Sequence, residues 1–225
     1  MSQILKILLP SSLLLYLPMF HSEKLTFGDV DVHLLYYENF IEDEHLHNLL
    51  PEEHLRLEKY HHPNRRREFI ATRVLRTMVF GNEPILYSEI GAPYIKGEGY
   101  ISISHATQVV GLAFSRFFPV GLDLEPIRDK VLNVAHKFLS AAEKEYFDMT
   151  NTKEMIKTWS GKEALYKLAG KKGIHLAKDL AIKQLEDGSW FGEINCENVR
   201  KKVHLSITER QDFVISVNPK AAIDV

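Results

Sequence analysis

"FIATRVLRTMVF" (residues 69–80) and "TWSGKEALYKLA" (residues 158–169) decide the fold class, because both repeat apolar residues at the period of a helix. They lie 89 residues apart in the chain. The same offset relates "VHLLYYENF" (32–40) to "GLDLEPIRD" (121–129), where each segment reads as a strand that leads into a loop. Similarity at one fixed spacing is typical of an internal duplication.

Two further pairs of segments extend the similarity along the chain. "LLPEEHLRLEKYHH" (49–62) matches "FLSAAEKEYFDMTN" (138–151), since each has an apolar pair, a helix start at Pro or Ser, and an acidic first turn. "YISISHATQVVGLAFS" (100–115) resembles "VHLSITERQDFVISVN" (203–218), and both read as a pair of strands joined by a turn.

We therefore predict an α+β protein formed by a pseudo-twofold duplication of two similar α/β subdomains. The boundary falls near Phe118 and Pro119, which gives subdomains of residues 1–118 and 119–225. Hydrophobic residues make up 45% of the 225 residues, enough to build a core in each.

The composition limits the classes of function. A formal net charge of -2 argues against a general nucleic-acid-binding protein. Residues 157–183 nevertheless hold seven lysines and two acids, which leaves room for a local phosphate site. Cys196 is the one cysteine of the sequence, so an internal disulfide is excluded and a reducing compartment is favoured. We expect a cytoplasmic monomer that binds neither nucleic acid nor membrane.

The apolar stretch "MSQILKILLPSSLLLYLPMF" (residues 1–20) weakly resembles a secretion signal, with a lysine before an apolar run. Pro10 and Pro18 interrupt it, and no small-residue cleavage site precedes His21. It is also too broken to span a bilayer. We expect an extension packed on the first sheet, with a signal peptide as the alternative.

Two carboxylates, Asp123 and Glu125, lie in an otherwise apolar strand and point to the same face. At the offset of the duplication they correspond to Leu34 and Tyr36, so the strand itself does not require acids. Two neighbouring carboxylates repel each other unless a cation lies between them, and a divalent ion bound by oxygen satisfies this. The alternative is a solvated pair on an edge strand.

The segment "WSGKEALYK" (residues 159–167) adds a third acid, Glu163, with Lys162 beside it and Lys167 one turn later. Glu163 could be a third oxygen ligand, and the two lysines could neutralise phosphate oxygens. The alternative is a Glu163–Lys167 ion pair on the helix surface.

At this point the sequence resembles the surfactin-type 4′-phosphopantetheinyl transferases. The resemblance covers the chain from about Val30 onward and rests on "SISHA" (102–106), "GLDLEP" (121–126) and "WSGKEALYK" (159–167). It implies transfer of phosphopantetheine from coenzyme A to a serine of an apo acyl or peptidyl carrier protein, with release of 3′,5′-ADP. It also implies a pseudo-dimer of two subdomains with the site at the seam.

The resemblance assigns roles to particular residues. Asp123, Glu125 and Glu163 would bind Mg²⁺, and Lys162 and Lys167 would contact the pyrophosphate of coenzyme A. Glu163 is the best candidate for the base, directly or through a metal-bound water, but the sequence does not separate this role from that of a metal ligand. Lys167 would be the catalytic cation.

Four more residues would bind the nucleotide. Ser104 and His105 resemble contacts to its phosphate, with His105 at the 3′-phosphate, and Arg56 and Arg73 match basic positions of the first half. The family often has Gly-Lys-Pro where this chain has Ala92 between a glycine and a proline, so one expected contact is missing. Carrier docking is expected at residues 129–147 and 170–174.

Other functions fit less well. A metal-dependent nuclease usually has a lysine just after the acidic pair, but Pro126 follows Glu125 here. A Ser104-His105-Asp123 hydrolase is disfavoured because adjacent strand residues point to opposite faces. A carrier-binding module of weak catalytic activity is the remaining alternative, and it does not explain why the carboxylates and lysines are present.

Overall fold

A computed structural model describes residues 21–38 and 40–225 of the chain. The apolar segment 1–20, for which the sequence predicts an extension on the first sheet, lies outside the described residues.

The first half of the chain forms an antiparallel sheet in the order β1 (His21–Phe27), β2 (Val30–Tyr36), β6 (Val109–Ser115), β5 (Tyr100–Ala106). A 3₁₀ helix and two α-helices lie between β2 and the later strands in the chain. Their bounds are Glu42–Asn48 for the 3₁₀ helix, Pro51–Leu57 for α1 and Pro63–Phe80 for α2. The small ribbon β3 (Leu86–Tyr87) and β4 (Pro93–Tyr94) follows α2.

The second half forms an antiparallel sheet in the order β7 (Leu122–Pro126), β11 (Phe213–Val217), β10 (Val199–Glu209), β9 (Trp190–Cys196), β8 (Leu180–Gln184), with β12 (Ile223–Asp224) pairing β10. Its helices follow β7 in the chain. They are a 3₁₀ helix (Asp129–Val134), α3 (Ala135–Phe138), α4 (Ala141–Tyr146) and α5 (Thr152–Ala169).

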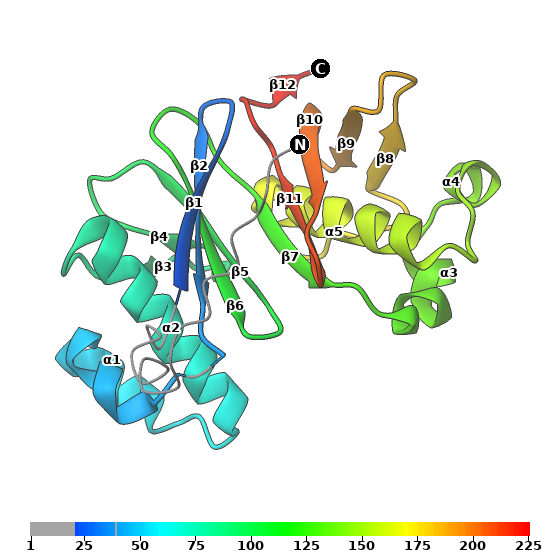
Figure 1. Cartoon of the computed structure of the whole chain (residues 1–225). Coiled ribbons are helices and arrows are strands. Elements are labelled where there is room, and N and C mark those ends of the chain that lie inside the picture. Colours follow the sequence, from blue (N-terminus) through cyan, green and yellow to red (C-terminus); the bar gives the residue numbers. More distant parts are fainter. Residues whose placement is uncertain (1–20, 39) are drawn as a thin grey trace, which may run out of the picture.

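The two sheets pack face to face, and one long helix covers the outer face of each. Figure 1 shows the strands in the centre of the molecule, with α2 beside one sheet and α5 beside the other. A buried cluster joins the sheets and includes Leu34, Ala113, Leu122, Leu124 and Ile215. Separate clusters lie under α2 and under α5. The mixed architecture with antiparallel sheets agrees with the predicted α+β class.

The strand order is the same in parts of the two halves. β2-β6-β5 in the first sheet corresponds to β7-β11-β10 in the second, and α2 and α5 each have 18 residues. Both helices also end at a glycine with positive φ, Gly81 and Gly170, as helix C-termini often do. The origin of this correspondence in a duplication stays a prediction.

Two serines join the halves at the seam. On its inner edge β7 pairs with no strand of the described part of the chain, and side chains of β5 replace one: Ser102 Oγ accepts from Leu122 N at 2.9 Å, and Ser104 Oγ accepts from Leu124 N at 3.0 Å. Because a buried N–H without a partner is costly, these hydroxyls fix β7 against β5. The "SISHA" motif therefore has a structural role in this chain.

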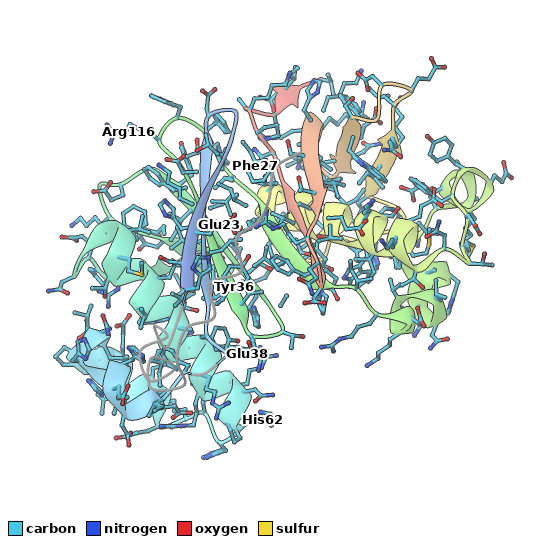
Figure 2. All side chains as sticks on the ribbon, in the orientation of Figure 1. Glu23, Phe27, Tyr36, Glu38, His62 and Arg116 are labelled. Carbon is cyan, nitrogen blue, oxygen red and sulfur yellow. The ribbon has the colours of Figure 1, made fainter. Side chains whose placement is uncertain are left out.

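An ion pair on the opposite side of the seam also links the halves. Arg210, in the turn between β10 and β11, donates from Nη2 to both oxygens of Glu23 on β1, at 2.8 and 2.6 Å. Tyr36 on β2 donates to the same carboxylate at 3.2 Å. Figure 2 shows Glu23 and Tyr36 on these neighbouring strands.

No helix of the described residues is long and apolar enough to cross a bilayer.

Gly121 determines how closely β7, the strand with Asp123 and Glu125, approaches α5. A Cβ atom added at Gly121 would lie 2.1 Å from Ala164 O and 3.0 Å from Leu168 Cβ of α5. Both neighbours are backbone or rigid, so a side chain at Gly121 must push β7 away from α5.

We expect Gly121→Ala to lower the free energy of unfolding by about 2–4 kcal/mol, because overpacking against backbone cannot be relieved by a rotamer change. Chemical denaturation measures it. The control is Gly188→Ala, where the new Cβ meets nothing within 4 Å but φ is +81°. The control should cost about 1 kcal/mol from backbone strain alone, and equal losses in the two variants would contradict the contact.

Candidate active site

A stripe of α5 faces the acidic strand β7. Trp159, Glu163 and Lys167 recur every four residues and therefore lie on one face of the helix. Trp159 Nε1 donates to Glu125 Oε2 at 3.2 Å, and Lys167 Nζ donates to Asp123 Oδ1 at 3.0 Å. The side chain of Glu163 lies between these two contacts along the helix. The structure thus brings together the three carboxylates that the sequence predicts as metal ligands.

Asp123 is the buried centre of this group. Its residue is 5% exposed, and its Oδ1 accepts from Lys167 and also from Ser104 Oγ at 3.1 Å. Its other oxygen, Oδ2, is buried and has no hydrogen-bond partner among residues 21–38 and 40–225. An ionised oxygen without a partner inside a protein is costly. Asp123 Oδ2 therefore lacks the compensating positive group or donor that a buried ionised oxygen needs.

The two other acids hold their protons more tightly than usual. Desolvation, and then the charge of Asp123, raise the pKa of Glu125 to about 7, while the bond from Trp159 opposes the shift. Desolvation and the charge of Asp123 also raise the pKa of Glu163, against the attraction of Lys167. Three carboxylates share the positive charge of Lys167, so the group has an excess of negative charge.

The residues fit a divalent cation in part. The unpartnered Asp123 Oδ2 and the excess negative charge suit a hard cation bound by oxygen. Within residues 21–38 and 40–225, however, no three or more His, Cys, Asp or Glu side chains converge in an arrangement that could hold a metal ion. Asp123, Glu125 and Glu163 are neighbours, but their carboxylates are not arranged around a common point at which an ion would bind. The Mg²⁺ site stays a prediction.

Lys167 lies inside the site. Its Nζ donates to Leu122 O at 2.7 Å, to Ser104 Oγ at 2.9 Å and to Asp123 Oδ1 at 3.0 Å. These bonds use all three hydrogens of the ammonium group. Lys167 therefore offers a fixed positive charge to a neighbouring phosphate, while its donors hold β5, β7 and α5 together.

The predicted pyrophosphate contact of Lys162 is wrong. Lys162 is 0% exposed and points to the other side of α5. Its Nζ lies 2.6 Å from Glu143 Oε2 and 2.8–2.9 Å from the carbonyl oxygens of Phe138, Leu176 and Leu180. Burial lowers the pKa of Lys162 and Glu143 opposes this, but four oxygens around one ammonium favour the charged form. Lys162 anchors α5 to α4 and to β8.

In the structure the hydroxyl of Ser104 has protein partners, and its predicted nucleotide contact stays a prediction. Ser104 is buried, and its hydroxyl is occupied by Leu124 N, Asp123 Oδ1 and Lys167 Nζ. A hydroxyl has one donor and two acceptor positions, so these three bonds saturate it. Ser104 orients Asp123 and Lys167.

A cleft of about 350 Å³ in the first half holds the predicted nucleotide-binding arginines, Arg56 and Arg73. The guanidinium of Arg56 lies 4.5 Å from the ring centre of Tyr87, and that of Arg73 lies 3.8 Å from the ring centre of Phe69. Arg73 Nη2 also donates to Tyr87 Oη at 3.4 Å. The cleft combines positive charge with aromatic surface, which suits a phosphorylated aromatic ligand.

A buried carboxylate holds Arg73 in this cleft. Glu53 Oε1 accepts from Arg73 Nε at 3.0 Å, and Glu53 Oε2 accepts from Arg76 Nη2 at 3.3 Å and from Leu50 N at 3.0 Å. Two arginines share one carboxylate, so the buried group keeps one net positive charge. This charge makes the cleft attractive to an anion.

His105, at the end of β5, connects the nucleotide cleft to the acids. It lines the 350 Å³ cleft and also a neighbouring cleft of about 440 Å³ that reaches Glu125. Desolvation lowers the pKa of His105, and the charges of Arg65 and Lys167 act in the same direction against Glu68. Gly91 and Pro93, which flank the Ala92 that replaces the usual lysine, line the nucleotide cleft as well.

The sequence did not reveal several residues of the site. Trp159 is uncharged and no sequence signal marks it as a partner of Glu125, although its spacing of four from Glu163 places it on the same stripe. Glu53, Glu68 and Tyr87 contact the arginines of the first half, and no motif marks them. Long-range contacts between α1, α2 and β3 bring them together, and local periodicity does not report such contacts.

We expect Lys162→Met to lower the free energy of unfolding by about 3–5 kcal/mol, because it leaves the buried carboxylate of Glu143 without its partner. Urea denaturation measures the loss. The double variant Lys162→Met/Glu143→Leu removes both charges and should recover much of it. A small effect of the single variant would show that the ion pair is not formed.

Glu125 should make the metal-free protein less stable as the pH rises. Its pKa is about 7 in the folded state against an ordinary 4.5. Between these values the unfolded chain loses the proton first, so stability falls with rising pH and stays low above pH 7. In EDTA, Glu125→Gln should stabilise the protein at pH 8 by up to about 3 kcal/mol and have little effect at pH 4.5. The same effect at both pH values would contradict the raised pKa.

Comparison with known proteins finds a family similarity in the second half of the chain. Residues 119–218 match the family model described as "ACPS: 4'-phosphopantetheinyl transferase superfamily". This segment runs from before β7 to just after β11 and contains all three carboxylates. No curated protein matches the chain. The antiparallel sheets are compatible with the fold of the superfamily. The match covers 100 of the 225 residues, and it shows that this part of the chain is similar to the 4′-phosphopantetheinyl transferase superfamily.

Proposed function

We propose that the chain is a surfactin-type enzyme that transfers 4′-phosphopantetheine from coenzyme A to a serine of an apo acyl or peptidyl carrier protein. The other product is 3′,5′-ADP. The observation that carries the proposal is the position of Asp123, with an unpartnered buried oxygen and with Glu125 and Glu163 beside it, next to a cleft lined by arginines.

Each part of coenzyme A has a place in this arrangement. Arg56 and Arg73 bind the nucleotide, which fills the cleft between Phe69 and Tyr87. His105 contacts the 3′-phosphate, where a donor imidazole is useful. The pyrophosphate then lies near Lys167, whose fixed charge stabilises it without needing a free N–H.

The acids hold the metal and move the proton. Asp123, Glu125 and Glu163 would hold Mg²⁺, which when bound neutralises the nonbridging oxygens of the diphosphate. The serine oxygen of the carrier bonds to the β-phosphorus, and the bond between this phosphorus and the bridging oxygen breaks. The electron pair leaves on 3′,5′-ADP, and the serine proton passes to Glu163. A carboxylate with a raised pKa suits this role near neutral pH.

The organisation of the chain follows the same proposal. Residues 1–118 would form the nucleotide subdomain and residues 119–225 the metal subdomain, as two copies of one ancestral unit. The carrier would dock on residues 129–147 and 170–174, which adjoin α5 in the chain. We propose a monomer that works in the cytoplasm, since one chain already contains both halves of the site.

The test is a mass measurement on the carrier. After incubation with the protein, coenzyme A and Mg²⁺, an apo carrier should gain about 340 Da, the mass of the phosphopantetheine arm. No gain on any of several carriers would overturn the proposal. Stable binding of a carrier without a gain would indicate the catalytically weak binding module, and cleavage of nucleic acid would indicate the nuclease.

We expect Asp123→Asn to abolish most of the transfer, by about 100-fold or more, because a metal ligand and the partner of Lys167 are lost together. The protein should stay folded, since the isosteric amide oxygen can still accept from Ser104. Circular dichroism checks the fold and the mass assay checks the rate. Full activity of the variant would remove Asp123 from the site.

A further inference from the structure

The carboxylate of Glu68 lies against Arg65 and His105 in the cleft that holds Arg56 and Arg73. Glu68 Oε2 lies 2.9 Å from Arg65 Nη1 and 3.1 Å from His105 Nε2. Arg65 Nη1 and His105 Nε2 are themselves 2.9 Å apart. Both nitrogens therefore converge on one point, and a carboxylate oxygen of the chain lies there. An oxygen of a phosphate would find the same two partners at that point.

The contact between Glu68, Arg65 and His105 lies at the boundary between two clefts. Arg65, Glu68 and His105 line both the 350 Å³ cleft with the arginines and the 440 Å³ cleft that reaches Glu125. Arg65 and Glu68 belong to the first turns of α2, whereas His105 ends β5, so the contact joins two elements far apart in sequence. Glu68 is the one acid among the residues that line the nucleotide cleft.

We propose that Arg65 is a further phosphate-binding residue, and that Glu68 competes with the phosphate of the ligand for Arg65 and His105. The inference rests on the proposed function, because that function brings a nucleotide with a 3′-phosphate into this cleft.

Competition follows from charge and from mobility. A phosphate and the Glu68 carboxylate cannot occupy the same point beside Arg65 and His105 without strong repulsion. The side chain of Glu68 is 23% exposed and that of Arg65 is 60% exposed, so the carboxylate can turn toward water when a phosphate arrives. Glu53 differs from Glu68, because Arg73, Arg76 and a backbone N–H hold the Glu53 carboxylate in the interior. Glu53 orients an arginine, whereas Glu68 blocks one.

The test compares two nucleotides by isothermal titration calorimetry. 3′,5′-ADP carries the 3′-phosphate and 5′-AMP lacks it. We expect Glu68→Gln to bind 3′,5′-ADP about three- to tenfold more tightly than the natural protein, because a partly exposed ion pair no longer has to break. The affinity for 5′-AMP should stay the same. In an Arg65→Ala background, the gain from Glu68→Gln should shrink to less than about twofold.

The matched control is Glu52→Gln, which makes the same change of net charge at an exposed position of α1. It should leave both affinities unchanged. Weaker binding of 3′,5′-ADP to Glu68→Gln would show that Glu68 orients the donors, and equal binding would show no competition; either result overturns the inference. So would the absence of 3′,5′-ADP binding to both proteins. The titration needs no carrier and no turnover, so failure of phosphopantetheine transfer is recorded separately.

Discussion

The fold and the site both depend on one buried contact, in which Lys167 and Ser104 meet Asp123 at the seam between the halves. Its three residues come from α5, β5 and β7, so each sheet and the second long helix contribute to it. The ammonium group compensates a carboxylate that would otherwise be buried alone, and the hydroxyl satisfies both groups together with a backbone N–H. Removal of any member leaves a charge or a donor without a partner.

The chain separates charges that hold the fold from charges that act on a ligand. Lys162 with Glu143, and Glu53 with Arg76, are fully surrounded by protein and anchor helices. Glu125 and Glu163 are less completely buried and lack such partners, and both have a raised pKa. The structural carboxylates are paired with buried cations, whereas Glu125 and Glu163 keep a raised pKa, which is typical of groups at a functional site.

The sequence predicts the helices well, because apolar periodicity and end residues are local properties: segments 69–80 and 158–169 fall at the same place in α2 and α5. The sequence also predicts that Asp123 and Glu125 of β7 lie close to Glu163 of α5. The sequence does not tell which of Lys162 and Lys167 faces the site. The two lysines are five residues apart and therefore lie on different sides of α5, and Lys162 faces away from the site because Glu143 packs there. The partners of the Ser104 hydroxyl are not predicted for a related reason: a motif gives the residue but not the groups that its side chain contacts.

The serine hydroxyls that complete the inner edge of β7 have a consequence for the autonomy of the second half. Residues 119–218, the segment that matches the family, end the sheet at β7 and do not contain Ser102 or Ser104. Expressed alone, this segment would expose an unprotected strand edge and the apolar face around Leu122 and Leu124. Open edges of this kind recruit strands from other molecules. The second half expressed alone is therefore expected to aggregate. In the whole chain the first half prevents this, because it covers the edge of β7 and the apolar face around Leu122 and Leu124.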